Sequence, residues 1–356
     1  MLNPPVPATL PDWPRTFGAP HAIADLRASP EDFRVDEQLG FAPDGEGEHA
    51  LVQIQKRNRN TVDVARLLAR HAGVRERDVS FGGLKDRNAV TTQWFSVWLP
   101  GRETPDWSPI ESNDLRVLVS ARHRRKLQRG TLQGNAFEIV LRNVEGDRDD
   151  LEHRLHTVAQ RGVPNYFGEQ RFGRDGGNLA KATEMFNGRR VKDRELRSLF
   201  LSAARSFLFN EVLAVRVQDG SWQRVLPGEA VMLAGKHSFF ICEQPDDEIE
   251  RRLLTVDIHP SGPLWGKGEL PTQGATRALE EWAVAAQPLF TEGLAKADLR
   301  QERRALRLPV ADFQWEWFTQ ADATALRLRF SLPSGSYATA VLRELVSPRD
   351  AASFTP

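Results

Sequence analysis

The residues best suited to chemistry are Lys85, Asp86 and Arg87, which place one acid between two bases. They follow the pair Gly82 and Gly83, where the backbone can turn without a Cβ penalty, so the stretch predicts a loop. A carboxylate held in such a loop can act as a nucleophile or as a general base. The simpler interpretation is a solvated hairpin turn without a catalytic role, and composition alone does not exclude it.

Regular elements should hold this loop in place. A short apolar run precedes it at residues 79–81, and residues 90–99 return to β-branched and aromatic types in near alternation. This pattern predicts that the loop joins two strands. Apolar residues also recur at helical spacing over residues 60–71, with Asn60 or Thr61 as the N-cap, so we expect a helix that leads into the loop.

Composition limits the classes of protein to consider. The chain has 356 residues, with 48 basic against 48 acidic side chains, so any contact with nucleic acid must come from local patches. Its single cysteine, Cys242, excludes an intramolecular disulfide framework, and we expect a cytoplasmic location. Residues 1–19 lack the pattern of a secretory signal, and no run of eighteen apolar residues predicts a membrane span.

The motif around Asp86 resembles the catalytic loop of the TruD family of tRNA pseudouridine synthases, in residues 83–86 and 89–94. Four other stretches are similar to that family, and the resemblance extends from about Ala24 to Leu345. These stretches are residues 28–35, 134–139, 163–173 and 332–345. Glu169 departs from the small residue expected at its position.

The resemblance implies a role for three charged residues. Asp86 would be the covalent catalyst, attacking either the ribose anomeric carbon or the uracil ring. Lys85 or Arg27 nearby would favour the ionised form of Asp86. Arg27 stands where the family commonly has lysine, which keeps the charge but changes its geometry.

The same resemblance implies the residues that hold the extruded base. Phe33, Phe137 and Tyr337 would pack against it, and Asn135 would pair with the uracil edge through its amide. Tyr337 replaces the usual phenylalanine. Its hydroxyl either extends the stacking surface or takes part in proton removal, and the sequence does not decide between them.

A basic run between two predicted strands, at residues 115–121 and 137–144, is a candidate for contact with RNA. Runs of this kind are usually solvated surface. Together with the family resemblance, however, this run favours contact with backbone phosphates. Its basic residues are Arg122, Arg124, Arg125, Lys126 and Arg129. A second basic stretch lies at residues 187–197.

The resemblance also implies the fold, an α+β protein with a mixed α/β catalytic domain around an antiparallel sheet. Residues 1–160 and 310–356 would form the catalytic domain, and residues 161–309 an inserted α/β TRUD domain. In the insertion we expect a basic helical face over residues 300–307. Near the C-terminus we expect a helix capped by Ser334 or Ser336.

These observations favour a tRNA pseudouridine synthase that acts on uridine 13 of tRNA. We expect it to be a monomer that needs no metal, no nucleotide cofactor and no membrane. The glycines at residues 173–177 lack the context of a nucleotide loop, and His153 and His156 lack a third metal ligand. The alternatives are a catalytically silent RNA-binding or RNA-folding protein, and a metal-dependent nuclease or hydrolase.

Overall fold

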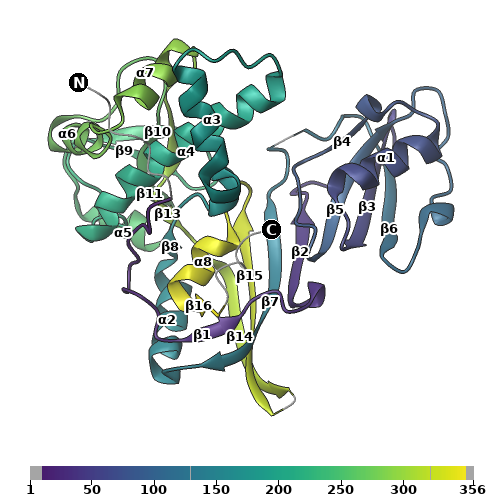
Figure 1. Ribbon diagram of the computed structural model, residues 1–356, viewed down its shortest axis with the longest axis horizontal. Helices are drawn as coiled ribbons and strands as arrows, with labels where there is room; N and C mark the ends of the chain where they lie inside the picture. Colours follow the sequence, from purple (N-terminus) through teal and green to yellow (C-terminus); the bar gives the residue numbers. More distant parts are fainter. Residues whose placement is uncertain (1–9, 129, 321, 350–356) are drawn as a thin grey trace.

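The computed structural model describes residues 10–128, 130–320 and 322–349. Their strands form a ten-stranded sheet, a four-stranded sheet and a two-stranded sheet. Figure 1 shows the large sheet running from the centre of the molecule to the side that carries α1, with most of the other helices on the opposite side. The structure thus combines helices with largely antiparallel sheets, which confirms the predicted α+β class.

The large sheet combines strands from both ends of the chain. Its main path is β14 (Ala311–Gln320), β15 (Ala323–Pro333), β7 (Gly134–Glu145), β2 (Phe33–Gln38), β5 (Val90–Trp98), β3 (His49–Arg57) and β6 (Leu115–His123). Off this path, β4 (Val79–Phe81) pairs with β5, and β1 (Ile23–Asp25) pairs with β7 and β16 (Ser347–Pro348). Most pairings are antiparallel as predicted, whereas β2–β5 and β1–β16 are parallel.

Strand β5 is buried on both faces, so it is a rigid support for the loop before it. Helix α1 (Thr61–Ala72) covers one face, where Val64 and Leu68 pack with Phe95 and Val97. On the opposite face, Trp94 packs in a second cluster with Leu39, Leu51, Leu127 and Leu132. The alternation of side chains along a strand explains how successive residues of β5 enter different clusters.

The other end of the large sheet is covered by α2 (Arg148–Arg161) and α8 (Ala338–Leu345). Leu151 and Leu155 of α2 and Val341 of α8 share one core with Leu328 and Phe330 of β15. The two helices come from distant parts of the chain. Their packing on one sheet face joins the two ends of the sequence into a single core.

The remaining elements form the second half of the molecule. The four-stranded sheet has the order β10 (Phe239–Cys242), β9 (Glu229–Leu233), β11 (Ile258–Leu264), β12 (Glu302–Ala305), and β8 (Val163–Pro164) pairs with β13 (Arg307–Leu308). Five helices accompany them: α3 (Gly177–Phe186), α4 (Arg194–Gln218), α5 (Asp247–Leu254), α6 (Gly274–Ala283) and α7 (Pro288–Lys296). By length and composition α4 could cross a membrane, but most of its apolar window is buried inside the protein, as in the core helix of a globular fold.

Two local expectations are wrong. Residues 300–307, expected as a helical face, contain β12 and β13, because their backbone pairs with β11 and β8. Neither Ser334 nor Ser336 caps α8, whose N-cap position is Tyr337 and has no side-chain capping bond.

Candidate active site

The loop between β4 and β5 is fixed at its backbone by α1 and β5. The amide of Lys85 donates to Oγ1 of Thr61 at 3.1 Å, and Thr61 donates in turn to Oε1 of Gln93 at 2.9 Å. Nε2 of Gln93 donates to the carbonyl of Gly83 at 2.6 Å. Thr61 and Gln93 are buried, so the loop is held by a short chain of shielded hydrogen bonds.

Asp86 lies in a partly open ion pair. Its Oδ2 is 3.0 Å from Nη2 of Arg27, and the two side chains are 22% and 9% exposed, respectively. The other carboxylate oxygen, Oδ1, accepts from Nε2 of Gln170 at 3.3 Å. The Arg27 guanidinium lies against this carboxylate with little access to water, while the remaining exposure leaves Asp86 open to a substrate.

Arg27 also touches the first of the predicted base-holding rings. Its guanidinium carbon is 4.2 Å from the centroid of Phe33, and Arg27 adopts a left-handed backbone conformation with φ of 56°. The Phe33 ring meets that of Phe137 edge to face at 6.3 Å, and Phe137 stacks on Phe330 at 5.2 Å. Phe33 and Phe137 are therefore buried core residues next to the ion pair, with little free surface in this structure.

Lys85 does not pair with Asp86. Its Nζ lies 2.6 Å from Oε1 of Glu37, whose side chain is fully buried and whose Oε2 accepts from the amide of Trp94 at 2.7 Å. Burial raises the pKa of Glu37, and the Lys85 cation opposes this shift. Lys85 thus ties the loop to β2, and among the described residues Arg27 is the ion-pair partner of Asp86.

Asn135 lies opposite Glu37 in the pairing of β7 with β2. It also faces Leu332 of β15, the strand that leads toward Tyr337. Its Oδ1 is buried and has no hydrogen-bond partner among the described residues. An unused amide acceptor close to the Lys85–Glu37 pair is available to a donor on a bound molecule.

Tyr337 meets the motif at residues 163–173. Its ring lies 6.1 Å from that of Phe167, and the guanidinium carbon of Arg171 is 6.0 Å from its centroid. Gly168 approaches Tyr337 and Thr339 so closely that a Cβ at this glycine would lie 2.7 Å from Oγ1 of Thr339. This close packing positions the segment from which Gln170 reaches Asp86.

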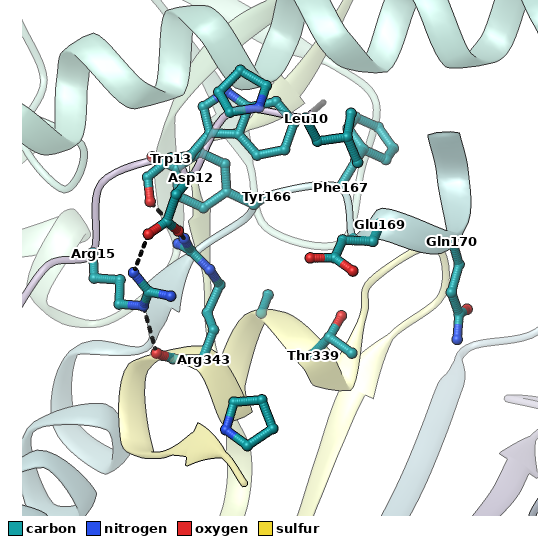
Figure 2. A pocket seen from close by; sticks show the side chains of 14 residues that line it. Leu10, Asp12, Trp13, Arg15, Tyr166, Phe167, Glu169, Gln170, Thr339 and Arg343 are labelled. Carbon is teal, nitrogen blue, oxygen red and sulfur yellow. Dashed lines mark hydrogen bonds and ion pairs between the residues drawn. The ribbon is translucent and has the colours of Figure 1, made fainter. Parts of the chain in front are cut away.

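A cavity of about 320 Å³ lies beside this segment (Figure 2). Figure 2 shows Glu169 and Thr339 facing each other across it, with Gln170 at its edge. Because Gln170 also donates to Asp86, this residue joins the cavity wall to the carboxylate. Sequence reasoning placed Gln170 within a family motif but gave it no role.

Lys56 is a second residue that sequence reasoning missed. It is buried on β3, and its Nζ donates to the carbonyl of Asp86 at 3.1 Å and to that of Arg59 at 2.7 Å. Burial lowers the pKa of Lys56 to about 8, although the nearby Asp86 opposes the shift. The only feature of the sequence that could have identified Lys56 is a lysine at an inward position of a strand. Lysine is rarely buried without a partner, so such a position indicates a specific contact.

Replacing Lys56 by methionine should slow turnover more than it weakens RNA binding, because the carbonyl of Asp86 loses its donor and the loop shifts. Between pH 8 and 10.5 the free energy of unfolding of the wild type should rise relative to that of Lys56→Met. The reason is that the unfolded lysine keeps a proton that the folded one has released. Denaturant melts across this range measure the difference, with exposed Lys296→Met as the control. Parallel pH profiles for the wild type and Lys56→Met would contradict the assignment.

Four of the predicted RNA-contact residues, Arg122, Arg124, Arg125 and Lys126, lie together at the end of β6 and in the segment after it. Arg124, Arg125 and Lys126 are exposed and line a cavity of about 700 Å³. Arg124 also pairs with Glu46, and Arg122 donates to the carbonyl of Arg102. Arg129 lies outside the described residues.

A larger cavity, of about 1100 Å³, lies between the two larger sheets. One wall is formed by loops at residues 39–41, 130–133 and 333–336, and the other by parts of β9, β11, β12 and β13. Its lining includes Lys236, Arg304 and Arg307, together with Arg303, whose charge is paired with Glu280; among the described lining residues Glu302 is the acidic one. Burial lowers the pKa of Arg304 to about 10, so its guanidinium remains charged at neutral pH. This cavity therefore has a cationic lining.

Among the described residues, no group of three or more His, Cys, Asp or Glu side chains is placed to hold a metal ion. His156 lies 4.0 Å from Glu152 and packs against Trp315. The geometry at Asp86 is therefore that of a carboxylate paired with an arginine, without a ligand cluster beside it in the part of the chain that the structure describes.

The chain is similar to known proteins along nearly its whole length. A family model described as tRNA pseudouridine synthase D (TruD) matches residues 16–186 and 176–345. The proteins named tRNA pseudouridine synthase D from Methylococcus capsulatus and Nitrosococcus oceani are each 52% identical to this chain, and the matches cover 94% and 93% of both partners, respectively. A crystal structure from Methanosarcina mazei that bears the same family name shares the fold, with a TM-score of 0.71 at 23% identity over 95% of this chain and 96% of that one. The chain belongs to the TruD family of tRNA pseudouridine synthases.

Proposed function

We propose that this protein converts uridine 13 of tRNA to pseudouridine, with Asp86 as the nucleophile. The observation that carries the proposal is the position of the Asp86 carboxylate, which is partly exposed and held between Arg27 and Gln170. Asp86 and Gln170 come from two separate family motifs, at residues 83–86 and 163–173, and Arg27 directly precedes a third, at residues 28–35. A charged carboxylate fixed in this way is suited to attack an electrophilic carbon.

The reaction is an isomerisation that balances without a cofactor. The bond between the ribose anomeric carbon and uracil N1 breaks, a bond to uracil C5 forms, the C5 proton leaves, and N1 gains a proton. Asp86 forms the covalent intermediate, either at the ribose or at the uracil ring. Arg27 stabilises the carboxylate before attack and after release, because its guanidinium donates directly to Oδ2.

Asn135, Phe33, Phe137 and Tyr337 would form the base pocket. The unused Oδ1 of Asn135 suits the N3–H of uracil, and this match supports its role in reading the base. Phe33 and Phe137 are buried next to Arg27, so we propose that they support the pocket wall and that the Tyr337 ring packs against the base.

The tRNA would lie along the cationic surfaces. We propose that Arg122, Arg124, Arg125, Lys126 and Arg129, together with the cationic cavity between the sheets, contact backbone phosphates. We also propose that residues 1–160 and 310–356 form the catalytic domain and residues 161–309 the insertion, a division supported by sheet membership. A monomer located in the cytoplasm fits this role.

Tritium release tests the proposed function directly. The protein is incubated with tRNA carrying tritium at uracil C5, and released label is counted while pseudouridine is mapped along the tRNA. We expect release in proportion to pseudouridine at position 13. Binding of the tRNA without release of label would favour the RNA-binding alternative, and modification only at another position would overturn the site assignment.

Replacing Tyr337 by phenylalanine should leave turnover within about threefold of the wild type, because the ring keeps its contacts with Phe167 and Arg171. Tyr337→Ala should lose far more, because it removes the ring. Single-turnover rates of pseudouridine formation measure both variants. A Tyr337→Phe defect as large as that of Tyr337→Ala would instead place the hydroxyl in proton transfer.

A further inference from the structure

Leu84 is an exposed apolar side chain in the loop that carries Asp86. It is 71% exposed, and it is the only residue of that loop among the large apolar side chains exposed on the described surface. Single exposed leucines are common on proteins and need no special explanation. The position of this one, two residues from the nucleophile, makes it a candidate for contact with the substrate.

The exposure of Leu84 is not due to a loosely held backbone. The carbonyl of Gly83, on one side, accepts from Gln93, and the amide of Lys85, on the other side, donates to Thr61. The side chain of Lys85 turns inward to Glu37, where it is 12% exposed. The fixed backbone on both sides therefore keeps the Leu84 side chain exposed to water. This exposure is unfavourable for an apolar group, and packing within the chain does not offset it.

The chemistry at Asp86 creates a place for such a side chain. Extruding a uridine from a stack leaves a gap between its neighbours, and proteins fill comparable gaps with apolar side chains such as leucine. Leu84 lies two positions before Asp86, so their Cα atoms are at most about 7 Å apart even in an extended chain. A side chain at this distance can reach the gap while the carboxylate faces the extruded nucleotide.

We propose that Leu84 enters the base stack of the tRNA and occupies the position that the target uridine leaves. It would act as a substrate-contacting residue that stabilises the extruded state, and this role rests on the proposed function. Its contribution is to the extrusion step, because the side chain carries no group that could act on a proton or a bond. Its loss should therefore affect extrusion and turnover more than overall tRNA affinity.

The test uses tRNA with 2-aminopurine next to the target uridine, whose fluorescence rises when stacking is lost, together with single-turnover tritium release. Leu84→Ala and Leu84→Gln should each slow the rise in fluorescence and the release of tritium about tenfold or more, since they remove the apolar contact. Leu84→Met, which keeps an apolar side chain of similar size, should stay within about twofold of the wild type. Leu254→Ala, at an 82% exposed leucine on α5, is the matched control and should change neither signal.

A second substrate separates filling of the gap from a general effect on the loop. If the nucleotide stacked on the target uridine is abasic, extrusion breaks less stacking, so the Leu84→Ala defect should shrink on this tRNA. Wild-type rates for Leu84→Ala, equal rates for Leu84→Gln and Leu84→Met, or an undiminished defect on the abasic tRNA would each overturn the proposal. Failure of the proposed function looks different, because the wild type itself would then release no tritium.

Discussion

Asp86→Asn should reduce tritium release from C5-labelled tRNA on the order of ten-thousandfold or more, the scale of loss seen when a nucleophile is removed. The amide keeps the shape of the side chain, and its one carbonyl oxygen can still accept from Arg27, but it cannot form the covalent intermediate. Asp86 is partly exposed and lies outside the hydrophobic clusters, so the fold should survive. Binding of tRNA, measured by filter retention at fixed salt, should stay within a few-fold of the wild type.

Asp114→Asn provides the matched control for this experiment. Asp114 also pairs with an arginine, Arg59, whose hydrogen bond lowers the pKa of Asp114. It directly precedes β6, and among the described residues its side chain accepts from Arg59 and Ser112 and not from any group that bonds to the Asp86 carboxylate. Its replacement should leave tritium release near the wild-type rate. Substantial turnover by Asp86→Asn, or equal losses in the two variants, would remove Asp86 from the role of nucleophile.

Arg216→Met should lower the free energy of unfolding by about 3–5 kcal/mol, the typical cost of leaving one member of a buried ion pair without its partner. Arg216 of α4 and Glu229 of β9 are both fully buried, with Nη1 of Arg216 at 3.0 Å from Oε1 of Glu229. Arg216 also donates to Oγ of Ser221 at 2.6 Å. Urea or thermal unfolding measures the loss.

The loss should depend on pH in a defined direction. Burial raises the pKa of Glu229, and Arg216 opposes this shift, so Arg216→Met raises the pKa of Glu229 further. A carboxyl with a raised folded-state pKa becomes more destabilising as pH rises above its unfolded value, near 4.3. The loss in free energy of unfolding caused by Arg216→Met should therefore be smallest near pH 4–5 and largest at pH 7 and above.

Two further variants make this prediction specific. Arg251→Met breaks an arginine–glutamate pair on the exposed side of α5 and should leave the free energy of unfolding nearly unchanged. The double variant Arg216→Met with Glu229→Leu leaves no unpaired charge and should recover much of the stability. A loss in Arg216→Met as small as that in Arg251→Met would contradict a structural role for the buried pair.

The sequence alone predicted the helix, the strand and the loop that surround Asp86. Near alternation of β-branched and aromatic residues predicted the strand over 90–99, and helical spacing predicted the helix over 60–71. Both patterns arise from contacts between near neighbours and from burial of one face, so they can be recognised in a single chain. The glycine pair at Gly82 and Gly83 marked the loop between the two strands.

Pairings between distant residues were harder to predict. Lys85 directly precedes Asp86 in the sequence, yet its ammonium pairs with Glu37 of β2. Lys56 was not singled out at all, because nothing in its immediate sequence indicates that two carbonyls would meet it inside the fold. Residues 300–307 carry charges suited to an exposed helix, whereas their burial against β8 and β11 makes them strands.

The identity of Asp86 as the acid to consider, and the family to which the chain belongs, were determined by the order of residues in short motifs. The three-dimensional structure alone decided which side chains meet that acid. Arg27 and Gln170 lie 59 and 84 residues away from it along the chain. Folding brings them to one carboxylate because burial of strands and helices far apart in the sequence fixes their mutual positions, and no local pattern encodes that distance.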